Sequence, residues 1–430
     1  MSGNKSSYSE ARAQDLESTK LRLKETWAKL STDEQDRLGT ILKNNHQFLL
    51  NIRDGNYEAL PDGFKPFPEL LMGHSLLHDD PDGLLNDADT ATYVDGDGLV
   101  YFGGVDYDQT DPKWSYTLFA WEETKGQTPP FPNNPAQVQI PNITTINLFG
   151  DWGGNNAASQ AVATCVQPND FLIHLGDVYY AGTDDSGFIE DNYEGNNFLD
   201  IWPGKSKTSF ALNSNHDMYA HGTGYFNMTL ASPTFASQNG TSYFALYNDV
   251  IRIVGLDTAY YDKSQSGMGF MNGNLGPDGV ATQAGFLEQQ AQLAADSGQT
   301  LILMSHHTGL SLDGTTQTDL MAQVVAKLSA MEGKKVIWYW GHEHIAAVYN
   351  DIIVAGVQIS PRCCGHSCIP WGVATNLENS TVAWYEKEVL GPGSNYFVTN
   401  GYAALSIDEN GTLTEKFLTQ NNAVHWSQSF

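Results

Sequence analysis

Basic residues are scarce in this chain of 430 residues. Lysine and arginine together number 22 against 50 aspartates and glutamates, so the formal net charge is -28. Such an acidic chain repels polyanions, and we expect no general affinity for nucleic acid or for an anionic membrane. A phosphate-containing ligand would have to be held locally, by metal ions rather than by the overall field.

Cysteine and long apolar runs are also scarce. Four cysteines are few for a disulfide-built protein, and three of them crowd into Cys363–Cys368. No stretch reaches the roughly eighteen apolar residues of a spanning helix, and the N-terminal segment is too polar for a secretory signal. We therefore expect a cytoplasmic protein, with secretion as the alternative because several Asn-x-Ser/Thr triplets occur.

The first 140 residues differ in pattern from the rest. Residues 1–54 carry apolar side chains near helical spacing, with a capping box at Ser31–Glu34, and predict a helical hairpin. Residues 55–140 are rich in proline, glycine and aspartate. They predict irregular β structure and loops packed on the core, with strand-like passages at Leu99–Phe102 and Trp114–Trp121.

Residues 141–430 predict the main domain, which 41% hydrophobic residues can supply with a full core. Helical patterns at Thr282–Ala295 and Leu320–Met331 alternate with short apolar runs, and this alternation is typical of an α/β fold. A late pair of runs within Tyr402–Phe417 predicts a β-hairpin. The other apolar runs are residues 143–149, 171–175, 209–213, 250–256, 301–305 and 336–340.

Polar residues stand where these runs end, and ligands of open α/β sheets gather at the carboxyl ends of strands. Each motif alone is weak, but the ordered set is improbable by chance. Oxygen and nitrogen donors without thiolate suit two medium-hard metal ions that share one carboxylate. Two such ions polarise a phosphoryl oxygen and make hydroxide available near neutral pH. The candidate ligands are Asp151, Asp177, Tyr180, Asn215, His306, His342 and His344.

This ordered set resembles the calcineurin-like metallophosphoesterases, and among them the purple acid phosphatases of the tartrate-resistant type. The resemblance covers roughly residues 143–362 and implies a two-sheet β-sandwich flanked by helices. The superfamily carries a histidine where Gly153 stands here, and Tyr180 follows Asp177 by three positions. Loss of that histidine and gain of this tyrosine go together in the purple acid phosphatases.

The resemblance also implies a division of ligands. Asp177 would bridge the ions, and Tyr179 would be a core aromatic. A divalent ion (iron, zinc or manganese) would lie on one side and iron(III) on the other. The first would be held by Asn215, His306 and His342, and the second by Asp151, Tyr180 and His344.

Neighbouring residues would serve the substrate. Since His306 and His307 are adjacent, only one can point along the ligand direction, and the family pattern favours His306. His216 would contact the phosphate, together with His307 and Asn215, and His216 or His307 would protonate the leaving group.

Two features depart from the family pattern. Ser214 replaces the glycine that usually precedes the amide ligand. The segment Ser360–Gly372 stands where the family has a short glycine-rich loop, and we expect it to form a lip of the pocket. Within it Arg362 and His366 are candidate substrate contacts, since a guanidinium grips phosphate well.

The predicted function is a metal-dependent, acid phosphatase-like hydrolase. It would cleave phosphomonoesters of small molecules by attack of a metal-bound hydroxide on phosphorus. A phosphodiesterase with the same metal centre is the near alternative. A non-catalytic binding module is the remote one, because such a module would be expected to have a broken ligand set.

Overall fold

The computed structural model describes residues 4–53, 71–79, 82, 93–94, 100–101, 106–107, 111–167, 169–184, 192–262, 269–390 and 397–430. The chain forms two compact units. One comprises residues 1–95 and 99–123, and the other residues 96–98 and 124–430. The division predicted above, at residues 54 and 140, stays a prediction. None of the helices in the described ranges is both long and apolar enough to span a bilayer.

The first unit begins with two long helices, α1 (Asn4–Lys29) and α2 (Thr32–Arg53). The turn between them contains the predicted capping box. The Ser31 backbone N–H donates to Glu34 Oε2 (2.9 Å), and the Glu34 N–H donates to Ser31 Oγ (3.4 Å). Because these bonds satisfy backbone donors that a helix start leaves free, they set where α2 begins. The N-terminal helical region is confirmed.

The strand expected at Trp114–Trp121 is wrong, because this segment is helical. It contains the 3₁₀ turn η3 (Pro112–Ser115) and the helix α5 (Tyr116–Glu123). The Asp111 side chain accepts from the Lys113 N–H (3.0 Å), and Pro112 suits the first helical position. A continuous apolar run fits a helix buried on all sides as well as a buried strand, so the pattern could not decide.

The rest of this unit is short. It contains α3 (Gly73–Leu77) and the antiparallel pair β1 (Tyr93–Val94) and β2 (Val100–Tyr101). The strand β2 falls within the strand-like passage Leu99–Phe102, whose end residues lie outside the described ranges. Most of the irregular segment expected between residues 55 and 110 also lies outside them.

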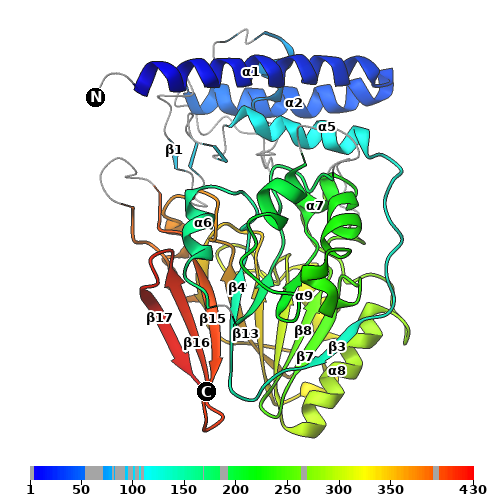
Figure 1. Ribbon diagram of the computed structural model, residues 1–430, viewed down its shortest axis with the longest axis vertical. Helices are drawn as coiled ribbons and strands as arrows, with labels where there is room; N and C mark the ends of the chain where they lie inside the picture. Colours follow the sequence, from blue (N-terminus) through cyan, green and yellow to red (C-terminus); the bar gives the residue numbers. More distant parts are fainter. Residues whose placement is uncertain are drawn as a thin grey trace. The chain divides into compact units, whose positions relative to one another are not determined.

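The second unit contains two mixed sheets (Figure 1). The larger has the order β14-β11-β13-β10-β9-β8-β7-β3, with β12 paired to β13. In it β8, β9, β10 and β13 run parallel to one another. Its strands are β3 (Ala136–Gln139), β7 (Phe244–Tyr247), β8 (Ile251–Leu256), β9 (Thr300–Ser305), β10 (Lys335–Trp340), β11 (Ala346–Tyr349), β12 (Ile352–Val354), β13 (Val357–Cys364) and β14 (Val382–Tyr385).

The smaller sheet has the order β17-β16-β15-β4-β5-β6. Its half made of β4, β5 and β6 is parallel, and its other half is an antiparallel meander that includes the predicted hairpin β15–β16. The strands are β4 (Thr144–Phe149), β5 (Phe171–His174), β6 (Ser209–Ala211), β15 (Gly401–Ile407), β16 (Leu413–Thr419) and β17 (Val424–Ser429).

Helices flank both sheets. The helix α8 (Gln283–Ser297) packs on β8 and β9, and α6 (Ala157–Ala163) packs on β15. Two short helices, α7 (Asn215–Tyr219) and α9 (Asp319–Val325), follow β6 and β9 along the chain. The two-sheet sandwich flanked by helices is confirmed.

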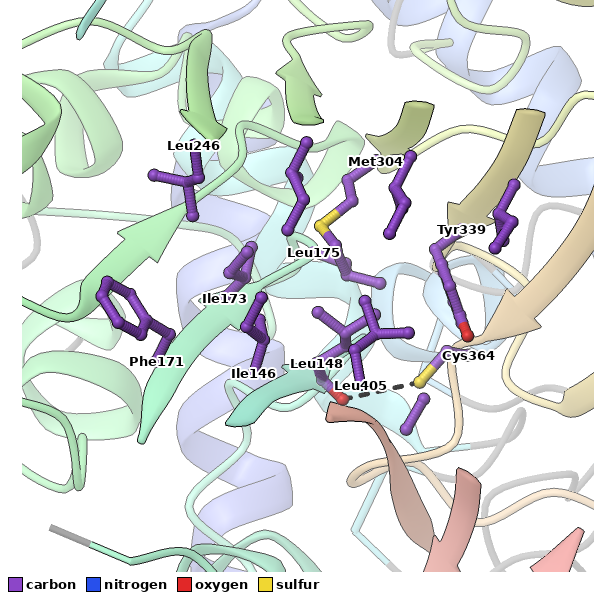
Figure 2. Packing of buried hydrophobic residues seen from close by; sticks show 14 of the residues in the cluster. Ile146, Leu148, Phe171, Ile173, Leu175, Leu246, Met304, Tyr339, Cys364 and Leu405 are labelled. Atoms are coloured by element: carbon purple, nitrogen blue, oxygen red, sulfur yellow. Dashed lines mark hydrogen bonds between the residues drawn. The ribbon is translucent and has the colours of Figure 1, made fainter. Parts of the chain in front are cut away.

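The inner faces of the two sheets share one core (Figure 2). Ile146 and Leu148 of β4 and Leu405 of β15 meet Leu246 and Met304 of the larger sheet, all fully or almost fully buried. Burial of an aliphatic side chain of this size stabilises the fold by roughly 1.5–3 kcal/mol. This core therefore holds the carboxyl ends of the central strands in fixed positions.

An ion pair also joins the two sheets inside this core. Arg362 of β13 donates to Glu415 Oε2 of β16 (3.0 Å), and the Tyr339 hydroxyl donates to Glu415 Oε1 (2.6 Å). The guanidinium carbon lies 5.4 Å from the Trp426 ring centroid. Since Arg362 is only 1% exposed, the structure argues against the phosphate contact expected for it.

This arrangement predicts the behaviour of variants of the pair. Glu415→Leu leaves the Arg362 charge buried without its partner, and we expect it to lower the free energy of unfolding by about 3–5 kcal/mol. The double variant Arg362→Met/Glu415→Leu removes both charges and should recover most of that loss. Urea unfolding followed by tryptophan fluorescence measures both. A double variant no more stable than Glu415→Leu alone would contradict this reading.

Candidate metal centre

The strand ends bring the predicted residues to one place. Asp151 follows β4, Asp177 follows β5 and His342 follows β10. All three adopt a left-handed backbone, with φ of 57°, 76° and 68°. Non-glycine residues rarely adopt this conformation, and when they do they cluster at functional sites. The turns end the strands and direct these three side chains to a common point.

Two glycines make room for this convergence. Gly176 has φ of 107°, and a Cβ there would lie 2.6 Å from His306 Nδ1. A Cβ on Gly341 would lie 2.5 Å from Asp151 Oδ2. Both distances are shorter than any real Cβ contact, so a side chain at either position would displace a candidate ligand.

Four acceptor atoms form what we call the amide group: Asp177 Oδ1, Asn215 Oδ1, His306 Nε2 and His342 Nδ1. His306 Nε2 lies 2.6 Å from Asn215 Oδ1 and 3.2 Å from Asp177 Oδ1. Asn215 Oδ1 also lies 3.2 Å from His342 Nδ1.

Three of these atoms, His306 Nε2, Asn215 Oδ1 and Asp177 Oδ1, have no proton to share among themselves, and only His342 Nδ1 could donate one, in one of its two tautomers. His306 Nδ1–H donates to the Leu175 carbonyl (2.9 Å), and burial holds the pKa of His306 well below its usual value. The ring is therefore neutral, and its Nε2 lone pair faces two oxygens. A cation among these atoms would turn the repulsion into coordination, so the amide group fits a metal ion.

A second set of atoms forms what we call the phenol group: Asp151 Oδ1, Asp177 Oδ2, His344 Nε2 and Tyr179 Oη. Tyr179 Oη lies 3.2, 3.0 and 3.1 Å from the other three atoms in that order. Three of the four atoms are oxygens, two of them from carboxyl groups, and hard oxygen donors of this kind suit a metal ion. This group also fits a cation.

Asp177 belongs to both groups, with one carboxylate oxygen in each. Burial opposes its ionisation, but the His306 and His216 imidazoles lower its pKa well below the usual range. Burial and the neighbouring Asp177 raise the pKa of Asp151 well above its usual range. Ionised Asp177 thus opposes the ionisation of Asp151, and bound cations would let both carboxylates ionise.

The structure places the two tyrosines differently from the expectation. Tyr179 was expected in the core, yet its hydroxyl lies among the candidate ligands. The Tyr180 ring lies edge-on to Tyr193 with centroids 5.7 Å apart, and its carbonyl accepts from His216 Nδ1 (2.6 Å). The ligand role of Tyr180 stays a prediction that these contacts do not support.

His216 and His307 differ in what their ring nitrogens face. His216 Nδ1–H donates to the Tyr180 carbonyl, which leaves Nε2 facing the centre, 3.9 Å from Asp177 Oδ2. Both nitrogens of His307 are occupied, one with Thr258 Oγ1 (2.9 Å) and the other with the Phe270 carbonyl (2.5 Å). Burial also lowers the pKa of His307 to about 4. The structure favours His216 over His307 as a proton donor.

Ser214 does not disturb its turn. It is the N-cap of α7 with an extended backbone, φ -140°, which needs no glycine. Its hydroxyl donates to Asp217 Oδ2 (2.6 Å) and accepts from the Asp217 N–H (3.2 Å). These bonds fix the start of α7 and thereby the position of Asn215.

The segment Ser360–Gly372 is only partly the expected lip. Its first part is the interior strand β13, and His366 is 3% exposed with its ring 6.0 Å from that of Phe417, so the expected substrate contact of His366 finds no support. Its last part does reach the centre, since the Trp371 ring lies edge-on to His344 (5.4 Å). Among the described residues, nothing accepts a hydrogen bond from Trp371 Nε1. In the sequence, the only indication that Trp371 lies near the centre was its position within this segment.

The domain is a two-sheet sandwich with a candidate metal centre at the ends of its strands. Residues 144–346 match the family model described as calcineurin-like phosphoesterase, and this part of the chain is a calcineurin-like metallophosphoesterase domain. The family uses two metal ions, in agreement with the two donor groups. No curated protein matches the chain in sequence.

The solved structures that the chain resembles have low sequence identity to it. GAP50, the anchor in the inner membrane complex of Plasmodium, is 13% identical with a TM-score of 0.44, over 67% of this chain and 88% of that one. The purple acid phosphatase PPD1 from yellow lupin (Lupinus luteus) seeds is 12% identical with a TM-score of 0.42, over 70% and 55%. A dimetal phosphatase from Danio rerio is 12% identical with a TM-score of 0.40, over 69% and 99%.

The adjacent histidines provide a matched test of the amide group. Nitrogens of His306, His307 and His342 all lie within 4.8 Å of one another, so either neighbour could in principle ligate. We expect His306→Ala to lower bound metal from two ions per chain to one, because its Nε2 faces Asn215 and Asp177. His307→Ala should retain two. Elemental analysis after dialysis measures both, and the reverse pattern would assign the ligand to His307.

The pH dependence of stability can be predicted from Glu194, a buried carboxylate. Glu194 is fully buried and accepts a hydrogen bond from the Thr229 hydroxyl. Burial and then the charge of Asp184 raise its pKa, and Glu194 in turn adds to the raised pKa of Asp217. Burial raises the pKa of Glu194 from 4.5 to about 7. A raised folded-state pKa gives stability that is fully present below the unfolded value and is lost as pH rises through the folded value.

In metal-free protein Glu194 should therefore lower the free energy of unfolding between about pH 4.5 and about pH 7, by up to about 1.4 kcal/mol per pH unit. Glu194→Gln keeps the contact with Thr229 and removes this contribution, so the slope of its free energy of unfolding against pH should be more positive by that amount. Urea midpoints at several pH values measure both slopes. Equal slopes would show that Glu194 does not titrate in this range.

Proposed function

We propose that this chain is a dinuclear metal-dependent phosphatase that hydrolyses phosphomonoesters of small molecules. The observation that carries the proposal is the position of Asp177. One of its oxygens lies in the amide group and the other in the phenol group, which is the arrangement two ions sharing a carboxylate require. Six of the seven predicted ligands contribute to the two groups.

The donor sets of the two groups differ. The phenol group combines Asp151, Asp177 and a tyrosine oxygen with His344, and such hard, anionic donors suit iron(III). The amide group combines two imidazoles with Asn215 and the shared carboxylate, which suits divalent iron, zinc or manganese. When bound, the two ions polarise the phosphoryl oxygens and supply the nucleophile from water.

Substrate turnover also needs a proton for the departing alcohol. His216 is held with Nδ1–H donating to the Tyr180 carbonyl, and its Nε2 faces the centre. Its ring is fixed between Tyr179 and Tyr219, with centroids 4.7 and 4.9 Å away. A proton on Nε2 would therefore be held next to the leaving oxygen of a phosphate placed over the two groups.

The role of His216 can be separated from that of His307 by the choice of substrate. An alkyl phosphate needs its leaving group protonated, whereas a nitrophenyl phosphate hardly does. We expect His216→Asn in metal-loaded protein to lower kcat for the alkyl ester by about 10²-fold or more, and kcat for the aryl ester much less. His307→Asn should lower both alike or not at all.

The class of activity is tested in the same assay with a bis-aryl phosphodiester. The proposal predicts that the phosphomonoester is the better substrate by kcat/KM. If the diester is instead the better substrate, the chain is a phosphodiesterase with the same metal centre. No hydrolysis of either ester with both metal sites filled would reject an enzymatic function.

A further inference from the structure

Two adjacent tyrosines follow Asp177, and the family motif assigns the ligand role to the second. The geometry points to the first: the phenol oxygen of Tyr179, and not that of Tyr180, belongs to the coordination shell of the ion in the phenol group. This inference rests on the proposed two-metal centre and assigns one of its ligands.

The hydroxyl of Tyr179 lies where a ligand must lie. Its Oη is within 3.2 Å of Asp151 Oδ1, Asp177 Oδ2 and His344 Nε2. Those three atoms are the other members of the phenol group, so a cation within reach of them is also within reach of Oη. The Tyr179 side chain is 0% exposed, which excludes a role as a surface aromatic.

The backbone of Tyr179 holds the side chain in this orientation. Its N–H donates to the Gly153 carbonyl (2.9 Å), and its own carbonyl accepts from Asn197 Nδ2 (2.7 Å). A Cβ on Gly153 would lie 2.6 Å from the Asp177 carbonyl oxygen and 2.9 Å from Val178 Cα. Position 153 therefore cannot carry a ligand side chain in this backbone, and the phenol fills the place beside Asp151 and Asp177.

Tyr180 has a different task in this geometry. Its ring packs against Tyr193, and its carbonyl accepts the Nδ1 proton of His216. The residue thus orients the proposed proton donor through its backbone.

The assignment also explains why the two groups should select different ions. A bound ion would be held by Tyr179 as the phenolate, with the hydroxyl proton released to solvent. The phenol group then offers Asp151, Asp177 and the phenolate, three anionic donors against one in the amide group. A trivalent ion gains more from this excess of negative charge than a divalent ion does.

Spectroscopy of the matched pair Tyr179→Phe and Tyr180→Phe tests the inference. Full-length protein is loaded with iron(III) and zinc, and the phenolate-to-iron(III) band in the visible spectrum is recorded with iron and zinc content. We expect Tyr179→Phe to lose the band and bind less iron while keeping zinc. Tyr180→Phe should keep both the band and the iron. Thermal unfolding of the metal-free variants checks that each folds.

Loss of the band in Tyr180→Phe with its retention in Tyr179→Phe would overturn the inference and leave the two-metal centre intact. If wild type binds two ions without a visible band, manganese binding by calorimetry replaces the spectrum. Tyr179→Phe should then weaken one of two sites by about ten-fold or more and Tyr180→Phe neither. Equal affinities in all three proteins overturn the inference. A wild type that binds no metal would overturn the proposed centre as well.

Discussion

The repulsion between acceptor atoms around Asp177 is the constraint on which the rest of this site depends. In the amide group the lone pair of His306 faces the oxygens of Asn215 and Asp177, with no proton to share. An arrangement like this is costly in a buried pocket unless cations occupy it. The fold must therefore hold these atoms in place before metal arrives, and its local features do so.

Several layers of structure support that arrangement. The core between the sheets fixes the ends of β4, β5, β9 and β10, and the left-handed turns at Asp151, Asp177 and His342 point three side chains inward. Ser214 caps α7 and sets Asn215, while Gly176 leaves room for His306. Each of these features positions a donor atom of the centre. The same residues thus contribute to the stability of the fold and to the proposed function.

Much of this could be predicted from the sequence. The central strands, the hairpin β15–β16 and six of the candidate ligands follow from apolar periodicity and from polar residues at strand ends. Trp114–Trp121 was mistaken for a strand because a segment buried on all sides shows no alternation of apolar and polar residues, and this alternation is what distinguishes a helix from a strand. Arg362 was only a candidate substrate contact, and the sequence does not show that it pairs with Glu415 across the core, which argues against that contact. The choice between Tyr179 and Tyr180 depends on how the chain turns after Asp177, which residue types alone do not reveal.

The central claim is that two cations share Asp177, and diffraction from crystals of manganese-loaded protein tests it most directly. Anomalous scattering locates the ions without reference to any assumed ligand. The account predicts two peaks, one beside each oxygen of Asp177, the first among Asn215, His306 and His342 and the second beside Asp151 and His344. A single peak, or two peaks away from Asp177, would contradict it.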